Sequence, residues 1–328
     1  MSGHVEISVL LPVYNGAPYI REALDSILAQ DHPAFEVIVI NDGSTDDTAA
    51  ILESYTDPRL RIIHQKNAGL AVTLHRGVEL ARGEFIARQD ADDISLPGRL
   101  SLQHKYLLDR PYCGLVGTWS RIMVDGLVTE RRHTHPTSNG ELQMWQVFDN
   151  FFVHSAVMFR KDIALQAGNY PREPEHYPPE DFYLWSRIAR IARVGNIDKE
   201  LVVYREVPGS ISRAKADLID TRVRTMAVDN LRFWLGDGDD DEMLGDLVRT
   251  IRLSENQLSH DCRWQRMHGT LRALEQQVIA RFPEDAADIR RASSEFRRRL
   301  WRMRLMKNHP LGWALRIAKR IVRAAIPN

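Results

Sequence analysis

Over the first 110 residues, short apolar runs alternate with segments in which apolar residues recur at helical spacing. The runs are rich in Val and Ile and predict strands at residues 5–13, 35–41, 60–64 and 84–88. The intervening segments predict helices at residues 18–30, 46–55, 68–81 and 97–108. Repeated strand–helix–strand units predict an α/β fold, in which a Rossmann-like, mostly parallel sheet carries helices on both faces.

The pattern changes after Gly114. Further strands are expected at residues 115–124, 126–131, 152–160 and 194–204. The first two of these form a hairpin. A helix is expected at residues 180–191, with Trp185 on its apolar face. We therefore predict an α/β domain over residues 1–213 and an all-helical C-terminal region over residues 214–328, in which only helical patterns remain.

The overall charge is balanced, but its distribution along the chain is not. The 328 residues contain 44 Lys and Arg and 44 Asp and Glu, so the formal net charge is zero. Residues 290–328 hold twelve Lys and Arg and one acid, a net charge of +11, which leaves −11 for residues 1–289. The acidic residues 1–289 are unsuited to binding a polyanion, whereas the basic residues 290–328 could contact an anionic partner.

Several features favour a cytoplasmic location. Hydrophobic residues make up 44% of the chain, which is enough for a packed core. No apolar run approaches the roughly 20 residues that span a bilayer. The N-terminal segment lacks the basic start of a signal peptide. Cys113 and Cys262 are too few for a disulfide framework or a cysteine-based zinc site.

A first polar cluster, NDGSTD at residues 41–46, directly follows the predicted strand at 35–41. In a doubly wound sheet, ligands bind beyond the carboxyl ends of the strands. Asp42 could there accept a hydrogen bond from a base N–H or a ribose hydroxyl. The same residues are also typical of an ordinary turn followed by a helix N-cap.

A second cluster, RQDADD at residues 88–93, follows the predicted strand at 84–88. Three carboxylates within four residues repel one another unless something neutralises them. Mg²⁺ or Mn²⁺ can do so, because each binds few protein carboxylates and completes its shell with phosphate oxygens and water. The alternatives are a solvated acidic turn and a helix N-terminus, whose dipole favours Asp.

A third cluster consists of Glu180 and Asp181 at the start of a predicted helix. A carboxylate here could act as a general base, although acids at a helix N-terminus also simply complement its dipole. His154 lies in a predicted strand, where a histidine by itself is more typical of a hydrogen-bonded core residue. Neither GxxxxGK[ST] nor GxGxxG is present to bind a nucleotide in the common ways.

Together these segments resemble the family 2 inverting glycosyltransferases of GT-A fold. The resemblance covers residues 7–212, and its motifs occur in the family's order: ISVLLPVYNGAPYIREALDSILAQ, VIVINDGSTDDT, NAGLAVTLHRGVELARGEFIARQDADDISLPGRL, HSAVMFRKD, PEDFYLW and VVYREVPGSIS. The chain looks most like bacterial members that build exopolysaccharide, capsule and lipopolysaccharide O-chains. The resemblance implies a nucleotide-binding half at residues 1–113 and an acceptor half at residues 114–213.

The resemblance also implies roles on the donor side of the site. Pro12 and Tyr14 would flank the nucleotide base, Asp42 would hydrogen-bond it, and Asp90 would contact the ribose. Asp92 would bind a divalent metal, Mn²⁺ or Mg²⁺, that bridges the donor diphosphate. Such a metal would stabilise the negative charge that develops on the leaving phosphate.

On the acceptor side, the resemblance implies that Asp181 is the base that deprotonates the acceptor hydroxyl. The side chains that would line this side are His154, Glu180 and Trp185. Positive charge develops at the anomeric carbon during the transfer, as in glycoside hydrolysis. One carboxylate on the face opposite the leaving group therefore suffices for a single displacement, which inverts the anomeric configuration.

Two segments depart from family patterns. Many members carry Arg-Asn in the helix after the Asn-x-Gly motif, where this chain has Leu-His at residues 74–75. Arg88 or Lys66 would have to replace that arginine at the donor phosphates.

Processive members combine a QxxRW motif with transmembrane helices, whereas this chain has HDCRW at residues 260–264. We therefore interpret Trp264 as a core residue and expect one sugar to be transferred per binding event.

Residues 313–326, WALRIAKRIVRAAI, predict a basic amphipathic helix, with basic residues on one face and apolar residues on another. This pattern is typical of an interfacial membrane binder, which anionic lipids attract. Docking of this kind would suit a lipid-linked acceptor. Alternatively, the helix packs on the acidic body or in an oligomer. Nucleic acid is disfavoured, because no aromatic–basic interleaving of a known binding module is present.

We therefore predict a metal-dependent inverting glycosyltransferase in the cytoplasm, peripheral on the inner face of the cell membrane. It would move a single sugar from a nucleotide-sugar, in particular a UDP-sugar, to a growing glycan or lipid-linked acceptor. One alternative is a sugar nucleotidyltransferase, but the loop PVYNGAPY lacks the Gly-rich, basic character of such enzymes. The other is a non-catalytic glycan- or nucleotide-binding scaffold, against which the intact Asp42, Asp92 and Asp181 argue.

Overall fold

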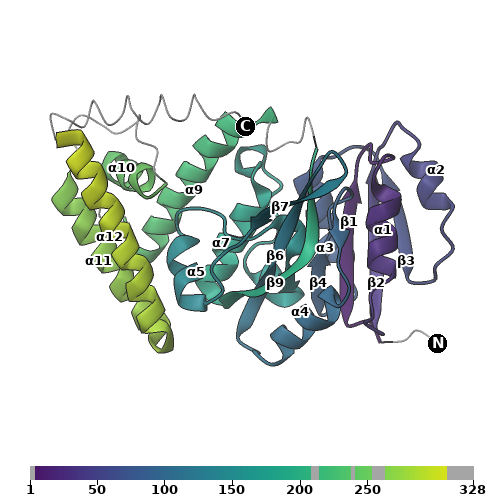
Figure 1. Cartoon of the computed structure of the whole chain (residues 1–328), viewed down its shortest axis with the longest axis horizontal. Coiled ribbons are helices and arrows are strands. Elements are labelled where there is room, and N and C mark those ends of the chain that lie inside the picture. The colour runs from purple at the N-terminus through teal and green to yellow at the C-terminus, as the bar shows by residue number, and fades with distance from the viewer. Residues whose placement is uncertain (1–3, 208–213, 238–240, 253–262, 309–328) are drawn as a thin grey trace. The chain divides into compact units, whose positions relative to one another are not determined.

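The computed structural model describes residues 4–207, 214–237, 241–252 and 263–308 (Figure 1). The chain divides into two compact units. The first comprises Met1–Gln146 and Asn150–Val223, and the second comprises Val147–Asp149 and Arg224–Asn328. The predicted basic helix at residues 313–326 lies outside the described residues.

The first unit is built on four parallel strands. They are β1 (Ile7–Val13), β2 (Phe35–Asp42), β3 (Leu60–Gln65) and β4 (Phe85–Arg88). Their order across the sheet is β3-β2-β1-β4, and β1 pairs with both β2 and β4 from Ile7 onward. All four strands lie in the apolar runs that predicted them, and the predicted parallel sheet is confirmed.

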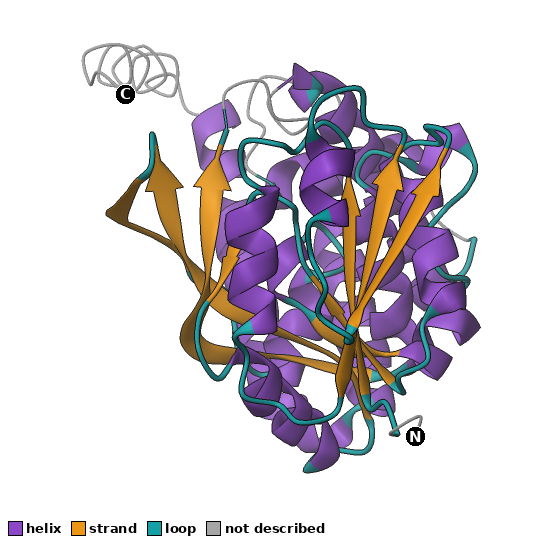
Figure 2. Ribbon diagram, turned by 90° about the vertical axis from the view of Figure 1, so that its right-hand side faces the viewer, coloured by secondary structure: helices purple, strands orange, loops and turns teal. Residues whose placement is uncertain are grey.

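Helices lie on both sides of these strands, as Figure 2 shows. The helices between and after them are α1 (Ile20–Leu28), α2 (Thr48–Glu53), α3 (Leu70–Leu80) and α4 (Arg99–Leu108). Successive side chains of a strand point to opposite faces, so β1 contributes to two cores. Val9 and Leu11 pack with residues of α1, α2 and α4, whereas Leu10 packs with residues of α3 and α7 (Glu180–Ile191).

A mixed set of strands extends the sheet beyond β4. These strands are β8 (Met158–Arg160), β6 (Cys113–Val124), β9 (Arg193–Glu206) and β5 (Ile94–Ser95), in that order. β8 is antiparallel to β4 and β6, whereas β9 runs parallel to β6. The predicted hairpin is confirmed, because β7 (Leu127–His133) pairs antiparallel with β6. Two short helices, α5 (Asn139–Trp145) and α6 (Lys161–Gln166), were not predicted.

The strand predicted at residues 152–160 is wrong over most of its length, because only β8 is a strand. His154–Ala156 instead form a single 3₁₀ turn, so His154 does not lie in a strand. Nearby side chains, and not a neighbouring strand, accept the backbone hydrogen bonds here. Asn150 Oδ1 accepts the N–H of Phe152 (3.1 Å), and Gln146 Oε1 accepts that of Phe151 (3.2 Å). The apolar side chains are buried without being part of the sheet.

The second unit is helical in its described residues. It contains the later part of α9 (Ala216–Leu235), followed by α10 (Asp241–Ile251), α11 (Trp264–Arg281) and α12 (Ala286–Asn308). Its buried apolar residues include Met243, Leu247, Met267, Leu271, Phe296 and Leu300. Trp264, which we interpreted as a core residue, begins α11 and is only partly buried. No helix in the described ranges is both long enough and apolar enough to cross a bilayer.

Candidate active site

The polar clusters after β1 and β2 meet at one edge of the sheet, because parallel strands place their carboxyl ends together. The N–H of Asn15 donates to Ser44 Oγ (2.9 Å), and that of Gly16 donates to Thr48 Oγ1 (2.9 Å). Pro12 is buried at the end of β1, whereas the side chain of Tyr14 is exposed at this edge. The side chain of Tyr14 is therefore accessible to a ligand.

Asp42 organises the loop that follows β3. Its Oδ1 accepts hydrogen bonds from Gln65 Nε2 (2.7 Å) and the N–H of Ala68 (2.8 Å), and its Oδ2 accepts the N–H of Gly69 (2.9 Å). Oδ2 keeps a lone pair with which it can accept a further bond from a ligand. The Asn-x-Gly segment is thus fixed at the start of α3 by a carboxylate.

We expect the Asp42→Asn variant to lose about 1–3 kcal/mol of unfolding free energy. An amide that accepts two of these bonds with its oxygen turns an N–H toward the N–H of Gly69, which then loses its partner in a partly buried position. Chemical denaturation of both proteins measures the difference. Asp47→Asn is the matched control, because Asp47 is exposed and makes no capping hydrogen bond to α2. Equal stability of the two variants would contradict the anchoring role of Asp42.

The three acids after β4 have different environments, although they are neighbours in the sequence. Asp90 accepts a hydrogen bond from Arg88 Nη2 (2.6 Å). Burial and the charge of Asp90 raise the pKa of Asp92 to about 6. Asp93 points inward, where it accepts hydrogen bonds from the Ser155 hydroxyl and from the N–H of Arg205. Burial raises the pKa of Asp93 well above its usual range, so Asp90 and Asp92 remain as the acids available to a ligand.

A buried arginine holds the turn that carries these acids. Arg99 is fully buried, and its Nη1 donates to Gln89 Oε1 and Ser95 Oγ, both at 2.7 Å. Its Nη2 donates to the carbonyl oxygen of Arg88 (2.6 Å). Arg205, which lies in β9, also holds this turn, since its Nε donates to the carbonyl oxygen of Asp92 (2.8 Å). We did not predict Arg99, Ser155 or Arg205, because nothing local in the sequence distinguishes them from surface residues.

Asp181 lies in the first turn of α7 and is partly buried. Asn150 Nδ2 donates to its Oδ2 (2.7 Å), and Oδ1 accepts the N–H of Phe182 (2.7 Å). Burial raises the pKa of Asp181 to about 6, and the charge of Asp90 contributes to this rise. Burial and the charge of Asp181 raise the pKa of Glu180 to about 7. A carboxylate whose pKa lies near neutrality is suited to accept a proton at pH 7.

His154 and Trp185 lie behind these acids. His154 Nε2 lies 3.1 Å from the Tyr170 hydroxyl, and its Nδ1 lies 3.9 Å from Glu180 Oε1. Burial lowers the pKa of His154 well below its usual value, so the ring is neutral. Trp185 is fully buried and packs edge to face against Tyr170, with ring centroids 5.8 Å apart. It supports the site from within the core.

Arg88 joins the two groups of acids. Its guanidinium is fully buried, and neither its Nε nor its Nη1 has a hydrogen-bond partner. Its positive charge lowers the pKa of both Asp92 and Asp181, while the negative charge of Asp90 raises both. The acids after β4 and those at the start of α7 therefore form one electrostatic cluster. A single site at this edge can bind a charged ligand and also accept a proton.

Comparison with known proteins identifies this arrangement. The model of the family "Glycosyl transferase family 2" matches residues 8–166. The O-antigen biosynthesis glycosyltransferase WbnJ of Escherichia coli is 33% identical over 205 residues, which cover 61% of this chain and 79% of that protein. The chain belongs to glycosyl transferase family 2. A second family relative, the amylovoran biosynthesis glycosyltransferase AmsE of Erwinia amylovora, is 31% identical and is spanned over 75% of its length.

The fold is also that of solved glycosyltransferases. S. aureus TarS 1–349 in complex with UDP-GlcNAc has a TM-score of 0.58 and 19% identity, covering 90% of this family 2 chain and 92% of that chain. The mannosyltransferase PcManGT from Pyrobaculum calidifontis, in complex with GDP-Man and Mn²⁺, has a TM-score of 0.52 and 19% identity over 93% and 87% of the two chains. The predicted GT-A fold is confirmed. The chain spans only 33% and 65% of the length of two other curated relatives, both uncharacterized glycosyltransferases.

The acids after β4 fit a divalent cation in this family 2 site. Arg88 forms its direct ion pair with Asp90, and the raised pKa of Asp92 indicates that the ionised form of Asp92 lacks a sufficient counter-charge. A cation beside Asp92 would supply that charge. Asp90 and Asp92 offer two carboxylates, which suits Mg²⁺ or Mn²⁺, because both ions take few protein ligands and keep the rest of their shell for phosphate and water.

Proposed function

We propose that this protein is a glycosyltransferase that moves one sugar from a nucleotide-sugar to a hydroxyl of a growing glycan or lipid-linked acceptor in surface-polysaccharide synthesis. The observation that carries the proposal is the electrostatic cluster that joins Asp90 and Asp92 to Asp181 through Arg88. The names of WbnJ and AmsE support the polysaccharide class. The UDP-GlcNAc bound to TarS supports a UDP-sugar as donor.

On the donor side, Tyr14 and Asp42 would contact the nucleotide base, with Pro12 beneath them, and Asp90 would contact the ribose. Asp92 would hold the metal, which when bound acts as a Lewis acid for the leaving diphosphate. Arg88 is fully buried and holds Asp90 in place through their 2.6 Å hydrogen bond. It therefore acts as a positioning residue rather than as a surface clamp on phosphate.

On the acceptor side, Asp181 would take the proton of the attacking hydroxyl. Asn150 fixes Oδ2 of this carboxylate, which restricts the direction from which the hydroxyl can approach. Glu180 and His154 would line the acceptor, and Trp185 would support them from the core. A base on the face opposite the leaving group gives a single in-line displacement and hence inversion at the anomeric carbon.

A panel of nucleotide-sugars tests the donor class. We expect at least one UDP-sugar to raise the melting temperature of the protein, and to do so more strongly with Mn²⁺ than with EDTA, because a ligand that binds only the folded state stabilises it. GDP-sugars and free UDP complete the panel. If none of these ligands raises the melting temperature, the proposal is wrong. Formation of a nucleotide-sugar from a nucleoside triphosphate and a sugar phosphate would instead identify a nucleotidyltransferase.

The rate of transfer is expected to fall as the pH falls through about 6, because Asp181 must be ionised to accept a proton and its raised pKa is about 6. Below that value kcat/KM would decrease about tenfold per pH unit. Asp92 titrates in the same range. The profile is therefore measured at two Mn²⁺ concentrations, because metal competes with the proton at Asp92 and not at Asp181. A rate that stays constant from pH 7 to pH 5 would contradict a base in this environment.

Membrane docking stays a proposal that rests on charge. The segment that would contact lipid, residues 313–326, lies outside the described residues. The preceding helix, α12, supports the idea in its described part, because Trp301 is 60% exposed and the neighbouring Arg298 and Arg302 are exposed as well. Exposed Trp and Arg side chains on one helix suit the interface of an anionic membrane.

A further inference from the structure

Two histidines and a glutamate meet at the end of the sheet opposite the proposed active site. Glu6 directly precedes β1, His32 lies in the connection from α1 to β2, and His104 lies in α4. His32 Nε2 lies 3.0 Å from His104 Nδ1 and 3.5 Å from Glu6 Oε2, and His104 Nδ1 lies 4.0 Å from the same oxygen. Within the described part of the chain, this is the one group of three such side chains whose ligand atoms lie within 4.8 Å of one another.

These separations match those of ligands around a tetrahedral metal ion. Two ligand atoms bound at about 2.0–2.1 Å and at a tetrahedral angle are about 3.3 Å apart, a value typical of Zn²⁺ with His and carboxylate ligands. The three observed distances bracket this value. Mg²⁺ and Ca²⁺ fit poorly, because both require more ligands and prefer oxygen. Two imidazoles with one carboxylate are ligands that select Zn²⁺ and similar transition metals.

The surroundings suit a metal with one open position. His32 and His104 are both buried. The side chain of Glu6 is 37% exposed, which leaves solvent access to the group. Phe85 packs edge to face against the His104 ring, with centroids 4.9 Å apart, and fixes its orientation.

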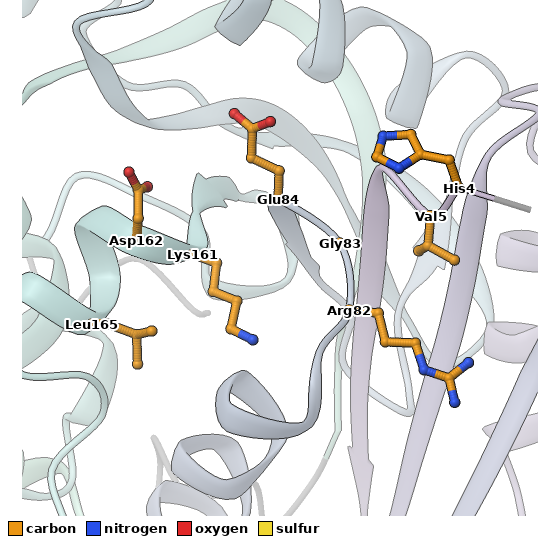
Figure 3. Close-up of a pocket in the computed structure, with 8 residues that line it drawn as sticks. All are labelled: His4, Val5, Arg82, Gly83, Glu84, Lys161, Asp162 and Leu165. Carbon is orange, nitrogen blue, oxygen red and sulfur yellow. The ribbon is translucent and has the colours of Figure 1, made fainter.

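The backbone around the group is also fixed. The N–H of Glu6 donates to the carbonyl oxygen of Ala34 (2.9 Å), and the N–H of Phe85 donates to that of Glu6 (3.0 Å). Figure 3 shows the surface that adjoins these segments: His4 and Val5, which precede Glu6, and Glu84, which precedes Phe85, line an open pocket of about 830 Å³. Lys161 also lines this pocket, and its Nζ donates a hydrogen bond to the carbonyl oxygen of Ala81 (2.6 Å). Water can therefore reach this end of the sheet.

Without a metal, one hydrogen bond joins the rings of His32 and His104. The N–H of Ala34 donates to His32 Nδ1 (3.2 Å), so His32 carries its proton on Nε2 and donates it to His104 Nδ1. A metal at Nε2 takes the place of that proton, which moves to Nδ1 or leaves. The Ala34 hydrogen bond is lost if the proton moves. The geometry of the three ligand atoms can be kept, since the metal takes the position between them.

We propose that Glu6, His32 and His104 form a Zn²⁺-type metal site that ties together the start of β1, the α1–β2 connection and α4. The site is separate from the metal proposed at Asp92. Glu6 precedes β1 and Asp92 follows β4, and these two strands are parallel, so the two sites lie at opposite ends of the sheet. The proposal does not depend on the glycosyltransferase activity, because its role is to stabilise the end of the sheet that does not carry the active site.

Titration with Zn²⁺ and Co²⁺ tests the site in the full chain. An Asp92→Asn background removes the donor-side carboxylate from the measurement. We expect one equivalent of Zn²⁺ to bind after treatment with a chelator and to raise the melting temperature. Co²⁺ should give the intense visible absorption of a tetrahedral complex. Mg²⁺ in excess should displace neither ion. Failure to bind one equivalent of either ion saturably would overturn the proposal.

Amide variants identify the ligands. Glu6→Gln keeps the size of the side chain, and His104→Asn and His32→Gln keep a hydrogen-bonding amide in place of the ring. All three amides bind metal weakly, so each variant should lower the Zn²⁺ affinity at least tenfold. His268→Gln, in α11, is the control and should leave the affinity unchanged. Glu6 is partly exposed, so its variant should fold even if a buried histidine variant does not. Wild-type affinity in the Glu6→Gln and His104→Asn variants would show that the metal binds elsewhere and would refute the proposal.

Discussion

The Asp181→Asn variant is expected to transfer sugar about 10²–10⁴ times more slowly than the wild type, which is the usual contribution of a general base. Asparagine keeps the size of the side chain and can still accept the N–H of Phe182, but it cannot take a proton from the acceptor hydroxyl. We therefore expect the loss in kcat, with little change in the affinity for the donor. Initial rates with a nucleotide-sugar and an acceptor glycan measure the first quantity, and calorimetry measures the second.

Asp162→Asn is the matched control for this variant. Asp162 lies in the first turn of α6, and its Oδ1 accepts the N–H of Ile163 at 2.7 Å, as Asp181 Oδ1 does with the N–H of Phe182. Asp162 is exposed, however, and follows Arg160, which pairs with Phe85 at the start of β4 and not at the end that carries the acids. Its loss should leave the rate unchanged. A rate within a few-fold of wild type for Asp181→Asn would assign the base to another residue, and Glu180 would be the next to test.

The Asp92→Asn variant should lose activity and gain stability. Transfer should fall at least a hundredfold, since metal stabilisation of a leaving group contributes several kcal/mol. The pKa of Asp92 is raised to about 6, so this carboxyl stabilises the folded state at low pH, and the contribution is lost as the pH rises through 6. At pH 8 without metal, the variant should be more stable than wild type by on the order of 1–3 kcal/mol. At pH 4 the difference should be small.

Denaturation of the metal-free proteins at the two pH values measures this effect. Asp125→Asn provides the control, because Asp125 occupies an exposed turn position at φ 48° that asparagine also tolerates. It should change neither activity nor the pH dependence of stability. If Asp92→Asn is instead less stable than wild type at pH 8, a favourable contact holds the Asp92 carboxylate. Burial and repulsion from Asp90 would then not dominate at this turn.

The sequence was sufficient for the parallel half of the sheet, because strands buried on both faces are continuous apolar runs and their turns contain Gly, Asn and Asp. The same reasoning failed at residues 152–160, since an apolar run reports burial and not the ladder of hydrogen bonds that defines a strand. β5 was missed because its two residues pair with β9, about a hundred residues later. No local pattern encodes such a pairing.

In the candidate site, too, the sequence predicted what depends on neighbouring residues and missed what depends on contacts with distant ones. Asp42, Asp90, Asp92 and Asp181 could be selected because each follows a strand or begins a helix. The resemblance selected Asp92 over Asp93, but the residue pattern alone could not, because the physical difference depends on Ser155 and Arg205, which contact Asp93 from 62 and 112 residues away. Arg88 was noted only as a substitute for a missing arginine, whereas its burial makes it the link between the two groups of acids.

The contacts of Arg205 have a consequence for the order in which the chain becomes functional during synthesis. The side chain stacks on Tyr19 and binds Glu22 of α1, while its N–H holds Asp93. A nascent chain that has released only the four parallel strands and the following turn already contains the acids after β4. Its acidic turn then lacks the last strand that fixes it. The turn proposed to hold the metal is therefore complete only after β9 has left the ribosome.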